Sequence, residues 1–305
     1  MINYFQNKEL LFVKFPIIFP IIYGFVLFVL PNFETELIFL TILLLAEPHF
    51  AATWPFFLNK INHNHIKENK LFLVFFPFIL LVFCLIGFFY FKNLFLLIFF
   101  AANVYHVTRQ SFGVMNLYTE KSEEKKIYTN LIYFFNLAFF LIAFFRFYIP
   151  LIKADDLIFL NGIVITIIIF ITVKYLIKFN YSENFLTMIT GILIFFPVCF
   201  VSNPVHAIIM GVTMHYTQYL YLTNKVEFKR SLNFSYKNLK KFWGIIFVYA
   251  IIMSFFSIVG KNDTEFLKNL IIIPITGQML HFYLDSQIWK FSIKHNRENI
   301  LRYIK

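Results

Sequence analysis

Long apolar stretches recur along the whole sequence and are separated by short polar segments. Most stretches approach the ~20 residues that an α-helix needs to cross a bilayer. The pattern predicts an all-α fold, a polytopic membrane helical bundle of about ten transmembrane helices that forms one integral membrane domain over residues 1–305. The predicted spans are 10–31, 36–58, 71–91, 93–118, 127–150, 157–178, 185–203, 204–223, 242–260 and 267–290. The seventh and eighth spans, joined at Ser202-Asn203-Pro204, also fit a re-entrant pair that crosses only part of the membrane.

Lysine and arginine residues alternate between the two sets of predicted loops. They concentrate in the N-terminal segment, in the loops 59–70, 119–126, 174–184 and 224–241, and in the C-terminal tail. The opposite set of loops contains Lys92, Lys153, Lys261 and Lys268. Because loops rich in Lys and Arg stay in the cytoplasm, both termini are predicted to be cytoplasmic, in a bacterial inner (cytoplasmic) membrane.

The composition excludes a soluble domain. Hydrophobic residues make up 60% of the 305 residues and charged residues 14%, whereas soluble domains carry about 25% charged residues. The net charge of +11 is concentrated in the loops, so we expect anionic lipid head groups at the cytoplasmic face as partners, and no nucleic acid. Cys84 and Cys199 lie in apolar spans without CxxC spacing, which predicts neither a disulfide nor a thiolate metal site.

The first candidate for chemistry is the polar stretch from Asn103 to Gly113, inside the span 93–118. His106, Arg109 and Gln110 lie at i, i+3 and i+4 and share one face of a helix. An arginine at this depth costs ~2.5–3.5 kcal/mol on insertion scales, so Arg109 is expected to face protein or water. A polar clamp that only fixes helix packing is the alternative, although ionisable residues inside membranes indicate function by default.

The second predicted span carries Glu47-Pro48-His49. A proline within a helix frees a backbone carbonyl and kinks the segment, which often occurs where a helix lines a cavity. Glu47 and His49 lie about 200° apart on a regular helix, so Glu47 is expected to reach the same site only through the kink. A protonated Glu47 that hydrogen-bonds a neighbouring helix is the alternative.

The eighth and tenth predicted spans each place a histidine beside hydrogen-bonding residues. His215, Gln218 and Tyr219 lie at i, i+3 and i+4. Asp285 lies one turn after His281 and is expected to accept the second ring N–H of a liganding imidazole; an ion pair with a loop lysine is the alternative. The other histidines are expected to lie outside the site: His206 as an interfacial or helix-start residue, and His63, His65 and His295 as solvated loop or tail residues.

Four histidines lie at a similar depth in spans that run in the same direction. Each lies roughly 8 to 12 residues before the cytoplasmic end of its span, a spread of about one helical turn. This layer predicts one shared metal centre with the ligands His49, His106, His215 and His281. Imidazoles suit Fe, Zn or Cu, and non-haem Fe(II) with open positions for dioxygen fits best with an apolar, membrane-dissolved substrate.

Other polar residues take supporting roles in this hypothesis. Asp285 and Gln218 would orient ligands from one turn or less away. Glu47 would be a further ligand or a proton carrier, Arg109 would stabilise charge beside the cavity, and Tyr219 would share the catalytic face. The predicted function is therefore a membrane non-haem iron oxidoreductase that acts on a lipid or isoprenoid-type substrate.

An all-helical membrane protein of about this length, with single histidines on several spans, resembles the bacterial Brp/Blh family of membrane β-carotene dioxygenases. The resemblance implies four histidines around one iron and cleavage that yields retinal. The local motifs differ, because Glu47-Pro48-His49-Phe50 replaces the family's His-Gly-x-x-Asp type of motif. His215 with Gln218 and Tyr219 likewise stands where the family has paired histidines one turn apart. These departures favour oxidation of another apolar lipid.

Two other readings of the intramembrane polar residues remain. In a transporter or proton-coupled carrier, Glu47, Arg109, Asp285 and the histidines would form an ion path. Against this, the sequence has no evident inverted repeat and few helices broken by Gly or Pro. In a packing scaffold, the same residues would form a purely structural polar core.

The alternation of charge predicts the orientation of two loops. Single cysteines that replace Lys67 and Lys261 should react with a membrane-impermeant thiol reagent from opposite faces, and Lys67 should be cytoplasmic. Labelling of both positions from the same face would contradict the predicted spans and the comparison of depths that rests on them.

Overall fold

The computed structural model describes residues 8–119, 122–149, 151–152, 154–179, 183–234, 236–260 and 265–304. Among these residues every regular element is helical, which confirms the all-α prediction. The chain divides into two units: unit 1 is Met1–Glu34 with Val107–Gln218, and unit 2 is Thr35–His106 with Tyr219–Lys305. Two long helices, α7 (Lys92–Tyr118) and α11 (Pro204–Phe234), contribute one part to each unit. The expectation of a single domain stays a prediction.

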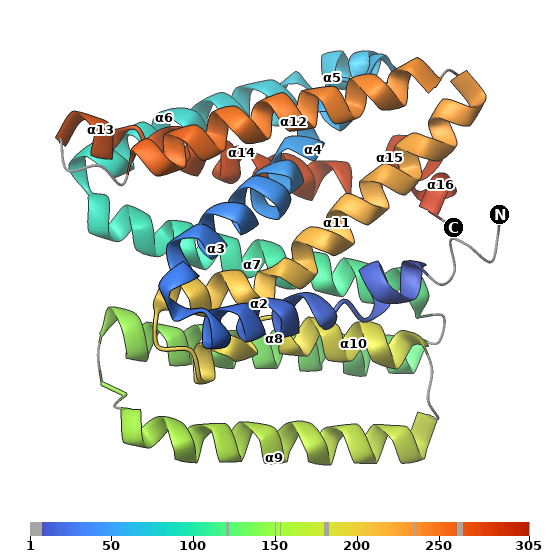
Figure 1. The fold of residues 1–305 in the computed structure, drawn as a ribbon. Helices are drawn as coiled ribbons and strands as arrows, with labels where there is room; N and C mark the ends of the chain where they lie inside the picture. Colours follow the sequence, from blue (N-terminus) through green and yellow to red (C-terminus); the bar gives the residue numbers. More distant parts are fainter. Residues whose placement is uncertain are drawn as a thin grey trace. The chain divides into compact units, whose positions relative to one another are not determined.

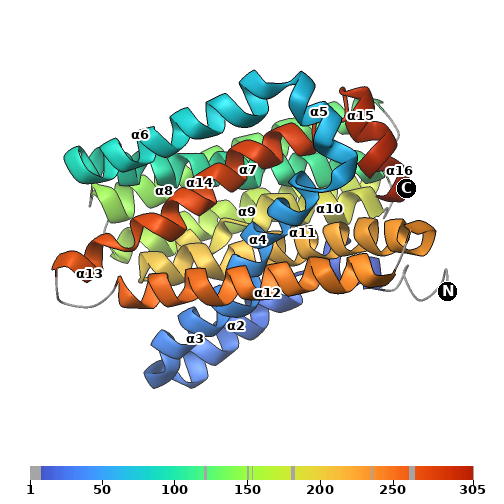
Figure 2. The same cartoon turned by 90° about the horizontal axis from the view of Figure 1, so that it is seen from above.

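Unit 2 is organised around α4 (Glu47–Phe57), which follows α3 (Glu34–Thr41) after a π-helical turn. Helix α4 packs against α12 (Tyr236–Val259) and α14 (Ile272–Ile288), and α14 also packs against α6 (Phe76–Tyr90) (Figures 1 and 2). A Cβ at Gly277 of α14 would lie 2.6 Å from the Tyr249 hydroxyl of α12, so the glycine permits this close approach. The short helices of this unit are α5 (His63–Glu68), α13 (Glu265–Asn269), α15 (Lys294–Asn296) and α16 (Arg302–Ile304).

Unit 1 contains α2 (Ile18–Val29), α8 (Ser122–Ala143), α9 (Ala154–Phe179) and α10 (Glu183–Leu193). Helices α8 and α10 pack side by side (Figure 1), and the buried Asn136 amide donates to the Gly191 carbonyl oxygen at 3.0 Å. Gly211 of α11 allows the closest backbone approach, because a Cβ there would lie 1.8 Å from the Ile194 carbonyl oxygen. Residues of α2, of the segment 193–202 and of α11 line an apolar cavity of about 570 Å³.

Prolines explain where three π-helical turns of the described chain lie. The turns Leu10–Lys14, Ile42–Ala46 and Leu71–Phe75 each end two residues before a proline. A proline inside a helix has no N–H and its ring clashes with the carbonyl four residues earlier. A π-helical turn changes the hydrogen-bond register at that point, so the helical path continues past Pro48 and Pro77 without the clash. The kink predicted at Pro48 is therefore observed as a π-helical turn, Ile42–Ala46, and α4 begins at Glu47, directly before the proline. Before Pro16 the helix ends at Lys14 instead, and the predicted span 10–31 is interrupted until α2 begins at Ile18.

Four helical stretches of the described chain are long and apolar enough to cross a membrane. They are Pro31–Phe57, Leu71–Tyr90, Glu123–Tyr148 and Leu239–Val259. The other predicted spans coincide with helical segments that do not meet both criteria, so the number of ten spans and the orientation of the termini stay predictions. Lys153 and Lys261, on which the predicted orientation partly rests, lie outside the described residues.

Two predicted boundaries are wrong. The expected loop 224–241 is largely helical, because α11 continues to Phe234 and α12 begins at Tyr236. No Gly or Pro occurs between Asn224 and Phe234, so the sequence offers no strong helix breaker there. The predicted span 185–203 is not one continuous helix, since α10 ends at Leu193 and a 3₁₀ turn follows at Phe196–Cys199, with Pro197 in its first turn.

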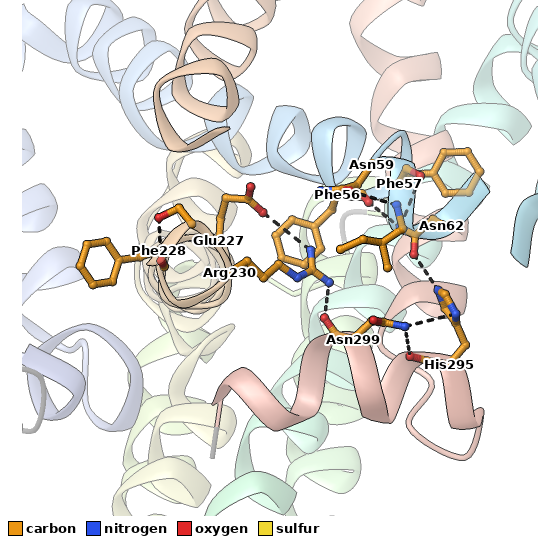
Figure 3. Close-up of polar contacts among 11 residues, drawn as sticks. Phe56, Phe57, Asn59, Asn62, Glu227, Phe228, Arg230, His295 and Asn299 are labelled. Atoms are coloured by element: carbon orange, nitrogen blue, oxygen red, sulfur yellow. Dashed lines mark hydrogen bonds and ion pairs between the residues drawn. The ribbon is translucent and has the colours of Figure 1, made fainter. Parts of the chain in front are cut away.

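The C-terminal segment of unit 2 is held by a buried arginine (Figure 3). Arg230 of α11 donates from Nη2 to the Asn299 carbonyl oxygen, and its guanidinium lies 4.8 Å from the centre of the Phe56 ring of α4. The carboxylate of Glu227, one turn earlier, lies 3.7 Å from Nη1. A buried guanidinium is tolerated only when it is paired, so this side chain ties the C-terminal segment to α4 and α11.

Two histidines expected to be solvated take part in the same contact. The His65 and His295 rings stack at 4.3 Å between centroids with an interplanar angle of 7°. Nε2 of His295 lies 2.7 Å from Asn62 Oδ1, and its Nδ1 lies 3.3 Å from the Asn299 side-chain nitrogen (Figure 3). An amide nitrogen only donates, so Nδ1 accepts and the His295 ring is held neutral. His206 is confirmed as a helix-start residue near the beginning of α11, where its Nδ1 lies 2.7 Å from the Tyr23 hydroxyl.

This arrangement predicts a loss of stability in mild acid. Burial, His65 and Arg230 lower the pKa of His295 more than Glu298 and Glu68 raise it. The unfolded chain therefore takes up the proton first, and the contribution of His295 to stability is lost as the pH falls below its ordinary pKa of about 6.5. Detergent-purified protein should lose more thermal stability between pH 7.5 and 5.5 than the His295→Gln variant. An equal loss in both proteins would contradict the neutral pairing.

Candidate metal centre

Three helices of unit 2 direct histidines toward one another. They are His49 of α4, His106 of α7 and His281 of α14. On α4, Thr53 lies one turn after His49, and on α14, Asp285 lies one turn after His281, so each helix presents its pair on one face. The three rings are buried, with exposed fractions of 0%, 7% and 0%.

The imidazoles lie within reach of one ion. One ring nitrogen from each histidine lies within 4.8 Å of the corresponding nitrogens of the other two, and Nε2 of His281 lies 3.2 Å from Nε2 of His106. Two nitrogens bonded to a metal at ~2.0–2.1 Å with tetrahedral angles lie about 3.3 Å apart. The His106–His281 pair therefore has the separation of two ligands of one ion, and His49 lies close enough to become the third.

The second ring nitrogen of His281 has its own partner. Nδ1 lies 2.7 Å from Thr53 Oγ1, and the same oxygen lies 2.7 Å from the Tyr219 hydroxyl. The Tyr219 hydroxyl donates to Asp285 Oδ1 at 2.5 Å. The expected direct hydrogen bond from His281 to Asp285 is therefore wrong, because the Thr53 and Tyr219 hydroxyl groups lie between the two side chains.

Aromatic side chains enclose the cluster. The Phe282 ring stacks on His106 with a centroid distance of 4.7 Å, and Phe50 contacts the edges of both His49 and His281. Tyr219 covers another side of His49, at 4.5 Å between centroids. Such surroundings exclude water and lower the local dielectric, which strengthens the interaction of a bound cation with its ligands.

The chemistry of these ligands restricts the ion. Neutral imidazole nitrogens suit Zn, Cu, Fe and Ni, whereas Mg and Ca prefer oxygen ligands. Three protein ligands also leave a coordination position for water or substrate, as in catalytic metal sites. The cluster is therefore suited to a transition metal with an open position.

The structure places the predicted ligands in different units. The predicted convergence of His49, His106 and His281 is confirmed. His215 is buried but belongs to unit 1, so its role as a fourth ligand stays a prediction. Glu47 is buried on α4 and is not a member of the cluster; its carboxylate lies beside the Gln278 side chain.

Two predicted supporting residues need correction. Arg109 is exposed because the buried positions Val104, Val107, Thr108, Ser111 and Met115 define another face of α7, about 200° from Arg109 when measured from Val107. Gln218 does not take the orienting contact expected for it, since its amide donates to the Val13 carbonyl oxygen at 2.7 Å within unit 1. Helical spacing shows which residues share a face of a helix, but it does not show whether that face is buried or which neighbouring residues it contacts.

Thr53 is the residue of the site that sequence reasoning missed. A threonine in an apolar helix is common, because its hydroxyl can bond a carbonyl of its own helix. The available signal was its position one turn after His49, the same relation that Asp285 has to His281. Only the packing of α4 against α14 shows that Thr53 faces His281.

Comparison with protein-family models, with curated proteins and with solved structures finds no match for this chain.

Proposed function

We propose that the chain is a membrane metalloenzyme in which His49, His106 and His281 hold one transition-metal ion. The observation that carries the proposal is the grouping of three buried imidazole nitrogens, from three separate helices, within 4.8 Å. Neutral imidazole nitrogens are common ligands of Zn, Cu, Fe and Ni, and one ion at this position could bind one nitrogen of each ring.

The reaction that we propose is oxidation of an apolar, membrane-dissolved lipid or isoprenoid-type substrate by a non-haem Fe(II) oxygenase. Four helices could span a membrane, and a substrate dissolved in the bilayer would reach such a protein laterally. Bound iron would supply the dioxygen chemistry. The part of the chain is to hold the ion through the three imidazoles and to keep water out with Phe50 and Phe282.

A proton carrier is the second candidate function. The hydrogen-bonded groups from His281 through Thr53 and Tyr219 to Asp285 favour it, because such chains can conduct protons across a membrane. This function requires no metal. The metal content of the protein therefore separates the two candidates.

Metal analysis tests the proposed centre. Protein purified in detergent and supplied with Fe(II) under reducing conditions should bind one ion per chain, as measured by elemental mass spectrometry. His49→Ala, His106→Ala and His281→Ala should each lose most of the bound metal, because two remaining imidazoles hold an ion poorly. If the analysis finds zinc instead of iron, the proposed metal centre stands but the proposed oxygenase reaction does not.

Matched variants control this experiment. His63 is exposed on α5, so His63→Ala should bind as much metal as the unmodified chain. His215→Ala decides between three and four ligands, since loss of metal in this variant would add His215 to the centre. Size-exclusion profiles and melting temperatures would identify variants that misfold. Absence of any transition metal from the well-folded protein would contradict the metalloenzyme and favour the proton carrier.

A further inference from the structure

The hydrogen bonds behind His281 have one consistent direction. Three contacts connect four buried groups: His281 Nδ1 with Thr53 Oγ1 at 2.7 Å, Thr53 Oγ1 with the Tyr219 hydroxyl at 2.7 Å, and the Tyr219 hydroxyl with Asp285 Oδ1 at 2.5 Å. The Asp285 carboxylate oxygen accepts from Tyr219, and a hydroxyl has a single proton to donate. The number of protons available to these four groups therefore fixes which group donates in each hydrogen bond.

The direction can be followed from the carboxylate. Tyr219 donates its one proton to Asp285, so the oxygen of Tyr219 must accept from Thr53. The only hydroxyl proton of Thr53 is then donated to Tyr219, so Oγ1 of Thr53 must accept a hydrogen bond from His281. Since Nδ1 of His281 is thereby protonated, Nε2 of the neutral ring carries no proton and can only accept.

We propose that Thr53 is a positioning residue that, together with Tyr219 and Asp285, fixes His281 in the tautomer whose Nε2 carries no proton. This nitrogen is the one that lies 3.2 Å from His106 Nε2. The functional role of this tautomer rests on the proposed metal centre, because a nitrogen that binds a metal must carry no proton. A hydrogen bond at the other ring nitrogen also orients the imidazole and raises its basicity.

The path also explains the buried carboxylate. Asp285 has an exposed fraction of 4% and lies one turn from His281 on the same helix. A buried charge is costly unless it is paired and hydrogen-bonded. A cation held by His281 would provide the opposite charge, and the two hydroxyl groups transmit the interaction between the imidazole and the carboxylate.

The test compares Thr53→Val with Thr53→Ser in two measurements. The first is the histidine tautomer in metal-free protein with ¹⁵N-labelled histidine, where His281 is assigned by the signal that His281→Gln removes. The second is the dissociation constant for Fe(II), or for Zn(II) if the purified protein binds zinc instead. Thr53→Val keeps the shape and removes the hydroxyl, so the Nδ1–H form should lose its dominance. The metal should then bind about 10–100-fold more weakly.

Thr53→Ser should restore both properties, because the serine hydroxyl occupies the same place in the chain of hydrogen bonds. Thr41→Val is the matched control: Thr41 is a buried threonine of α3 whose hydroxyl donates to the Leu37 carbonyl oxygen at 2.7 Å. Removal of this hydroxyl should change neither the His281 tautomer nor the affinity for metal.

The two readouts separate this inference from the proposed function. If the His281 tautomer changes in Thr53→Val but no variant binds a metal, the positioning role stands and the metal centre fails. If Thr53→Val retains the Nδ1–H tautomer and the unmodified affinity, the positioning role is overturned while the centre stands. A loss in Thr53→Val that Thr53→Ser does not restore would also overturn it, because the hydroxyl would then not be the cause.

Discussion

The arrangement of unit 2 depends on one constraint, the burial of three imidazoles within 4.8 Å of one another. Each ring has two nitrogens that need a partner, and an apolar helical interior provides few. The three histidines come from α4, α7 and α14, so the constraint fixes the relative rotation of three helices at once. A rotation of one helix by a single residue, about 100°, would remove its imidazole from the cluster. Close packing at Gly277 limits such freedom for α14 against α12.

Helical periodicity extends the same constraint along the helices. His49, Thr53 and Phe56 follow one face of α4, while His281, Asp285 and Trp289 follow one face that starts in α14 and ends at its C-cap. The two faces meet in successive layers: imidazole on imidazole, the Thr53 hydroxyl with the relay through Tyr219 to Asp285, and the Phe56 ring stacked on Trp289. Arg230 then lies over Phe56 and ends the series with a charge held by the C-terminal segment.

The sequence predicts the part of the site that depends on how deep a residue lies in its predicted span and on the period of the α-helix. His49, His106 and His281 could be grouped because the distance from a predicted helix end is a property of one helix at a time. The exposure of Arg109 could not be predicted in this way, since it depends on which face of α7 is covered. The contact of Gln218 with Val13 and that of Thr53 with His281 join residues far apart in sequence, and periodicity carries no information about such pairs.

The fold shows the same division. Apolar stretches identified the helices, and proline positions indicated irregularities, but not that the chain would form π-helical turns before them. The charge of the segment 224–234 predicts a loop, although the segment contains no helix breaker and continues α11. Polarity predicts where a helix leaves the membrane, whereas only Gly, Pro and tertiary contacts predict where it ends.

X-ray absorption spectroscopy at the edge of the bound metal tests the central claim most directly. The account predicts a first shell with three nitrogen ligands at about 2.0–2.2 Å and the outer-shell scattering of imidazole rings. This scattering should decrease in the His281→Ala variant. A shell of oxygen or sulfur ligands without imidazole scattering, or scattering that is unchanged when His281 is replaced, would show that the metal does not bind at the three histidines and would contradict the account.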